Sequence, residues 1–165
     1  MEPTAQKRAA LMPEAVSRTR QRMLRHNIQV FADYFQFYIW DRDVSTIAPE
    51  NYTDDDVLRR LKVAPNVVVI QPIRNTIVPV QVDLHDVDPG FEPTEWDHIV
   101  ECSLDLPTGG LQIGECTGEP VLDLDIRPGS YRVRALFAGL ETLSENGLEG
   151  TITIGLCSGS AHPFP

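Results

Sequence analysis

The amino-acid sequence predicts a mainly β protein, an antiparallel β-sandwich of about eight strands with one short helix near residues 54–62. Seven short runs after residue 66 alternate apolar and polar side chains with a period of two. Pro, Gly, Asn and Asp residues separate these runs, and no long helical stretch intervenes. A chain of 165 residues is long enough for one domain with a core and too short for two comfortable ones.

The first 26 residues differ from the rest in charge. Residues 1–26 hold six Lys and Arg against two acids, whereas residues 27–165 hold eight against 22, a net charge of −14. We expect residues 1–26 to form a basic tail or a short helix after Pro13, residues 27–157 the sandwich, and residues 158–165 a C-terminal tail. The basic segment has no continuous apolar block, as a secretory signal would, and no apolar run is long enough to cross a bilayer. A cytoplasmic location is therefore expected.

The domain is expected to open with NIQVFADYFQFYIWD, residues 27–41. Apolar residues alternate as far as Tyr34, and the phase then slips by one residue to Phe35, Phe37 and Ile39. Such a slip predicts either a β-bulge or a strand covered on both faces. Aromatic and β-branched residues favour a strand over a helix here.

The helix near residues 54–62 has signals at both of its ends. Thr53 is a suitable N-cap, and three aspartates follow it in the first turn, where the helix dipole favours negative charge. Arg59, Arg60 and Lys62 occupy the last turn, where the dipole favours positive charge. These aspartates are better explained by helix stabilisation than by metal binding.

Two of the later runs are expected to form a hairpin around Pro128-Gly129. The pairing would place Asp123 or Asp125 across from Arg132 or Arg134 on the solvated face, where such pairs help to fix the register. The seven runs are VVVIQP, TIVPVQVDL, DHIVECSLDL, GLQIG, PVLDLDI, SYRVRALF and TITIGL.

The strongly acidic body is the opposite of what nucleic-acid binding requires, and it would attract a basic protein partner. The loop VDLHDVDPGFEPTEWD contains the densest group of carboxylates, with a tryptophan beside them. Three interpretations stay open: a solvated loop, a partner-binding loop, and a calcium site completed by Asp41 and Asp43. The candidate partner-binding residues are Asp83, Asp86, Asp88, Glu92, Glu95, Trp96, Asp97, Asp123 and Asp125.

No catalytic, metal-binding or cofactor-binding motif is present in the sequence. The four histidines are scattered, and His85, close to two aspartates, has no accompanying nucleophile motif. The three cysteines have no zinc-ligand spacing, and Cys102 is expected to be a buried free thiol. We therefore expect no enzyme activity, no metal and no cofactor.

One stretch, WDHIVECSLDLPTGGLQIGECTGEPVLDLDIRPGSYRVRALF, resembles the C-terminal half of the competence-J family of small acidic bacterial nuclease inhibitors. The similarity lies in an apolar strand followed by TGGLQIG, another strand and PGSYRVR, and NIQVFADYFQFYIWD resembles the opening strand of that family. The resemblance implies a non-enzymatic inhibitor or immunity factor that binds a basic nuclease or toxin.

Three other functions remain as alternatives. The first is a calcium- or ligand-binding sandwich of the C2 type, with Asp83, Asp86 and Asp88 converging on one point. The second is a small hydrolase or isomerase with His85 or His98 in a pocket beside a carboxylate. The third is a structural or assembly subunit with a large exposed apolar patch.

The closing segment TITIGLCSGSAHPFP lacks the aromatic strand that the family resemblance leads us to expect. One choice of codons for TITIGLCSG, read one base earlier, encodes Asp-His-Tyr-His-Arg-Ala-Leu-Phe-Trp, which has a strand-like pattern. We therefore hypothesise that the tail carries a frameshift. A coding DNA whose earlier frame shows a stop codon would remove this hypothesis.

Overall fold

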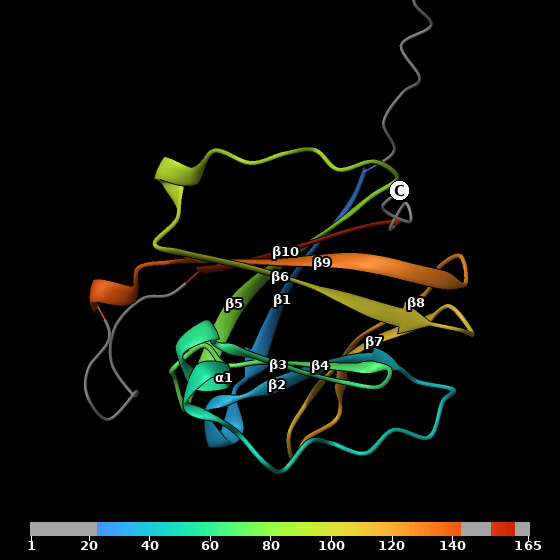
Figure 1. Cartoon of the computed structure of the whole chain (residues 1–165), viewed down its shortest axis with the longest axis horizontal. Helices are drawn as coiled ribbons and strands as arrows, with labels where there is room; N and C mark the ends of the chain where they lie inside the picture. The colour runs from blue at the N-terminus through green and yellow to red at the C-terminus, as the bar shows by residue number, and fades with distance from the viewer. Residues whose placement is uncertain (1–22, 143–152, 161–165) are drawn as a thin grey trace, which may run out of the picture.

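The computed structural model describes residues 23–142 and 153–160, which form two stacked five-stranded sheets (Figure 1). The predicted mainly β sandwich is confirmed, and the described residues form ten strands rather than about eight, with one parallel pair, β5 with β10. Sheet A has the order β1 (Met23–Phe31), β5 (Ile77–His85), β10 (Thr153–Ser160), β9 (Gly129–Ala138), β6 (His98–Leu106). Sheet B has the order β3 (Leu61–Ala64), β4 (Val67–Ile70), β2 (Phe37–Asp41), β7 (Gly110–Glu115), β8 (Pro120–Asp125).

The core lies between the two sheets and is built from the alternating residues of both inner faces. Val30, Val80 and Phe137 come from sheet A, and Phe37 and Ile113 from sheet B, and each is almost completely buried. Burial of each such side chain stabilises the fold by roughly 1.5–3 kcal/mol. The period of two in the sequence therefore places one apolar face of each sheet against the other.

The phase slip near residue 35 is a change of sheet, so the expectation of a β-bulge there is wrong. Strand β1 belongs to sheet A and β2 to sheet B, and the short 3-10 turn η1 (Asp33–Phe35) joins them. The other expectation, a strand covered on both faces, describes β2. Its Phe37 and Ile39 face the core, and Tyr38 packs in a second cluster with Tyr52.

The expected hairpin around Pro128-Gly129 is also wrong. Strand β8 lies beside β7 in sheet B, whereas β9 lies between β10 and β6 in sheet A. The chain therefore crosses between the sheets, and Asp123 and Asp125 do not face Arg132 and Arg134. Leu122 and Leu124 of β8 pack on the same core as the inward residues of β9, so the apolar alternation is the same as in a hairpin.

The short helix α1 (Asp54–Arg59) begins at its expected place and ends earlier than expected. Thr53 and Asp56 form a capping box, in which each side chain bonds the backbone N–H of the other residue. Arg60 adopts a left-handed conformation with φ 58° and ends the helix. Lys62 lies in β3, and its ammonium contacts the Asp56 carboxylate at 2.7 Å.

The predicted domain limits are only partly covered by the described residues. Strand β1 begins at Met23 and β10 ends at Ser160, while residues 1–22, 143–152 and 161–165 lie outside the described part of the chain. The predicted N-terminal helix falls in the first of these segments, and the side chains relevant to the frameshift hypothesis are likewise not described. Within the described ranges, no helix is long and apolar enough to span a membrane.

Candidate protein-binding surface

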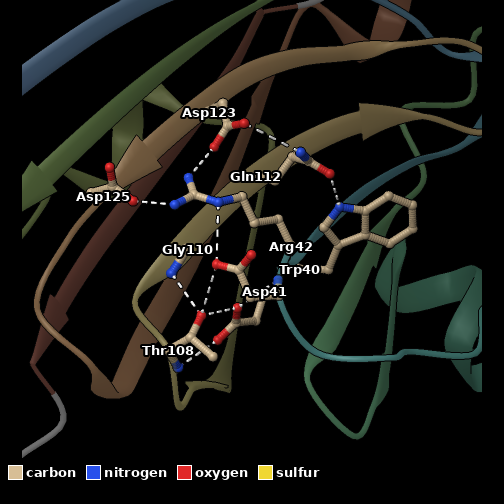
Figure 2. Close-up of polar contacts among 9 residues, drawn as sticks. Trp40, Asp41, Arg42, Thr108, Gly110, Gln112, Asp123 and Asp125 are labelled. Carbon is tan, nitrogen blue, oxygen red and sulfur yellow. Dashed lines mark hydrogen bonds and ion pairs between the residues drawn. The ribbon is translucent and has the colours of Figure 1, made fainter.

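Asp123 and Asp125 lie on edge strand β8 and are both engaged by Arg42, which follows β2 (Figure 2). The Arg42 guanidinium also contacts Asp43 at 3.2 Å. The hydrogen bonds that Arg42 donates to Asp125 and Asp123 raise the pKa of Arg42 above its ordinary value. The predicted acidic pair therefore shares one arginine within the chain, keeps a net negative charge and links β2 to β8.

Another carboxylate in Figure 2, that of Asp41, is buried at the end of β2. It accepts hydrogen bonds from the Thr108 hydroxyl and from the Thr108 backbone N–H, the latter at 2.8 Å. Burial by itself would raise the pKa of Asp41, but these bonds and one from the Asp43 backbone outweigh it, so the pKa is lowered. Asp41 thus fastens β2 to the turn between β6 and β7.

The loop between β5 and β6 crosses the outer side of sheet A (Figure 1). We call residues 86–97 the acidic strap. Asp88 of the strap makes two hydrogen bonds to Arg134 of β9, at 2.9 and 3.0 Å, and Glu101 of β6 binds the same guanidinium at 2.6 Å. The centre of the Phe91 ring lies 4.5 Å from the central carbon of the Arg134 guanidinium. The buried Arg134 therefore pins the strap to the sheet.

Other predicted residues of this region also have partners inside the protein. Asp83 is buried on β5, and its carboxylate accepts a 2.7 Å bond from Arg25 of β1, the main reason that its pKa is lowered. Asp97 accepts hydrogen bonds from the backbone N–H groups of Gly139 and Leu140 at 2.7 and 3.0 Å. Trp96 is half-buried.

The nine predicted residues are divided between the two sheets. Seven belong to β5 or the strap on sheet A, and the remaining two, Asp123 and Asp125, belong to sheet B. Asp86, Glu92 and Glu95 of the strap are exposed. No group of three His, Cys, Asp or Glu residues in the described ranges lies close enough together to hold a metal ion.

A cleft of about 270 Å³ brings Asp86 and Asp125 near each other between the two sheets. It also contains His85, as the hydrolase interpretation requires. Asp125 is held by Arg42. His98 lies elsewhere, with its ring nitrogen Nε2 2.9 Å from the backbone oxygen of Arg59. Among the side chains that the structure describes, the cleft therefore offers a histidine beside carboxylates. The cleft is lined by Leu24, Leu84, His85, Asp86, Asp125, Ile126, Arg127 and Tyr131.

The sequence did not reveal a group of exposed apolar side chains at the opposite end of β1. Tyr34 and Phe35 of η1 are 68% and 41% exposed, although their place in an apolar run predicted burial. Phe31 and Ile77, paired in register on β1 and β5, are exposed as well. The only signal in the sequence was the phase slip at Phe35, which marks the turn that exposes these rings.

The class of fold is a two-sheet sandwich in which the chain crosses between the sheets after β1, β4, β6 and β8. No protein-family model matches the chain, and no curated protein matches its sequence. Among solved structures, the fold is similar to that of ComJ, the inhibitor of the DNA degrading activity of NucA from Bacillus subtilis. The TM-score is 0.65 at 17% identity, over 86% of this chain and 98% of that chain. The resemblance to the competence-J fold is thereby confirmed.

A second solved structure is described as crocagin biosynthetic gene J. It matches with a TM-score of 0.48 at 21% identity, over 82% of this chain and 97% of that chain.

Proposed function

We propose that this protein is a non-enzymatic binding protein that inhibits a basic nuclease or a nuclease toxin. The observation that carries the proposal is the similarity in fold to ComJ, a nuclease inhibitor, over nearly the full length of that protein. Because one fold hosts many functions, the proposal also relies on the surface. The net charge of −14 over residues 27–165 is the second support.

The electrostatic argument starts from what a nuclease must do. Nucleases hold DNA phosphates with Lys and Arg side chains, so their binding clefts are basic. An acidic protein is attracted to such a cleft and competes there with the phosphates. In this chain Asp86, Glu92 and Glu95 are exposed on the strap, where a partner can reach them. Asp83, Asp88, Asp97, Asp123 and Asp125 shape the surface through their internal bonds.

A DNA-degradation assay tests the proposal. Purified protein is titrated against two nucleases, NucA and any nuclease encoded beside the gene of this chain, with plasmid DNA as substrate. We expect inhibition of at least one nuclease that is complete near one inhibitor per nuclease and weakens as salt rises.

The control is an unrelated protein of similar net charge, which we expect to leave the nuclease active. The proposal is wrong if neither nuclease is inhibited at low salt by a tenfold excess. It is equally wrong if the unrelated acidic protein inhibits as well, or if this chain itself degrades the DNA.

A further inference from the structure

We propose that the apolar end of the sandwich, rather than the acidic strap, is the anchor that docks on the nuclease, an inference that rests on the proposed function. The apolar end comprises six exposed side chains of β1, η1, α1, the β4–β5 loop and β5. These are Phe31, Tyr34, Phe35, Leu58, Ile73 and Ile77.

Hydrogen bonds join the segments that carry these side chains into one end of the molecule (Figure 1). The backbone N–H of Ala32 donates to the Thr76 oxygen at 3.0 Å, which fastens η1 to the start of β5. The backbone N–H of Gln71 donates to the Arg60 oxygen at 3.0 Å, which fastens the β4–β5 loop to the end of α1. The Tyr52 hydroxyl, just before α1, donates to the Gln36 side chain at 2.9 Å.

The turn at this end is held in a conformation that bulky residues rarely adopt. Tyr34, Phe35 and Ile73 have φ angles of 53°, 62° and 55°, in the left-handed region. The Asp33 carboxylate accepts a hydrogen bond from the Tyr34 backbone at 3.0 Å and one from the Thr117 hydroxyl at 2.6 Å. The turn is thus fixed by specific bonds while its two aromatic rings remain exposed.

The exposed rings of Tyr34 and Phe35 do not stabilise the isolated molecule by packing, although the turn that carries them is strained. Aromatic side chains grouped on a surface are typical of binding hot spots, where a partner buries them. The turn therefore holds Tyr34 and Phe35 in place before the partner arrives, which lowers the entropy lost on binding.

The charge around the apolar end indicates a basic partner. Asp33 and Glu115 each accept a backbone hydrogen bond at this end. Asp54 and Asp55 are exposed in the first turn of α1, and one exposed base, Arg59, lies in its last turn next to the apolar end. A second copy of this chain would bring the same acids against each other, because a two-fold interface places the same surface patch of both copies in contact. A basic nuclease surface complements this acidic rim and covers the rings.

Two glycine substitutions separate binding from folding. Tyr34→Gly and Phe35→Gly each remove an aromatic side chain at a position where glycine adopts a positive φ without strain. We expect each variant to inhibit the nuclease at least about 30-fold more weakly than the wild type. We expect its melting temperature to be unchanged or higher. The matched control is Leu24→Ser, which removes a 60% exposed apolar side chain at the other end of β1 and should leave inhibition unchanged.

The outcomes distinguish this inference from the proposed function. If the wild type inhibits and both glycine variants inhibit equally well, the docking end is wrong and the inhibitor function stands. The inference is also wrong if Leu24→Ser weakens inhibition as much, or if gel filtration shows that the glycine variants only dissociate a dimer of this chain. If the wild type inhibits neither nuclease, both proposals fall.

Discussion

Arg25, Arg42 and Arg134 each bind carboxylates that are distant in the sequence. The paired residues are 58, 81 and 46 positions apart for Arg25–Asp83, Arg42–Asp123 and Arg134–Asp88. Composition identified the acids, but it contains no information on which arginine reaches them. The acids of the loop were therefore predicted without partners, and Asp123 and Asp125 with the wrong arginines, whereas much of that charge is used to join strands.

At the residue scale, the Cys102 thiol should be inert in the folded protein. Burial raises its pKa to about 11, so the reactive thiolate is scarce at pH 8. In a Cys116→Ser/Cys157→Ser variant, we expect a thiol reagent to label Cys102 only as fast as the protein unfolds. The measurement is the labelling rate with and without denaturant. Complete labelling of the native variant within the mixing time would contradict the buried position.

At the element scale, Arg134 should control the mobility of the acidic strap. Arg134→Leu removes the bonds to Asp88 and leaves Glu101 with fewer partners, so we expect a loss of about 2 kcal/mol of stability. We also expect faster hydrogen–deuterium exchange in residues 86–97.

Arg132 of the same strand provides the matched control. Its side chain donates to Glu101 and Ser103 on β6. Arg132→Leu should therefore leave exchange in the strap at the wild-type rate. Equal exchange in the strap of both variants would show that Arg134 does not pin it.

Helix α1 should make the stability of the protein depend on pH through Asp56. The bond from Lys62, followed by those from Thr53, lowers the pKa of Asp56 to about 2. A carboxyl whose pKa is lower in the folded state stabilises the fold above its unfolded pKa, and this contribution is lost as pH falls from about 4 to 2. Unfolding free energies of wild type and Asp56→Asn should therefore converge over this range.

Lys62→Met is the control for the pH experiment, because it removes the main donor to the Asp56 carboxylate. The loss of stability as pH falls from about 4 to 2 should be smaller in this variant than in the wild type. A wild-type advantage over Asp56→Asn that persists at pH 2 would contradict the role of Lys62.

Long strands were predicted better than short strands that lie at the junction between two elements. Long alternating runs, such as those that became β5, β6 and β9, show a clear period of two. Strand β3 has only four residues and starts directly after Arg60, so its Leu61 and Lys62 were read as the last turn of the helix. Four residues are too few to separate a strand period from a helical one.

At the scale of the whole molecule, alternation does not reveal which sheet a strand joins. Inward residues of both sheets meet in one core, so Leu124 of β8 and Val133 of β9 show the same pattern as the two arms of a hairpin. Strand pairing depends on contacts between segments far apart in the chain. The sandwich was therefore predictable, and its four crossings between sheets were not.

The central claim is that an acidic sandwich binds a basic nuclease without acting on a substrate. The most direct measurement is the Kd of the complex with the inhibited nuclease at about 50 mM and about 300 mM NaCl. We predict tight binding at low salt and a Kd at least about tenfold higher at high salt, since the attraction between the two charged surfaces is screened. A Kd that does not change with salt, or no binding at low salt, would contradict the account.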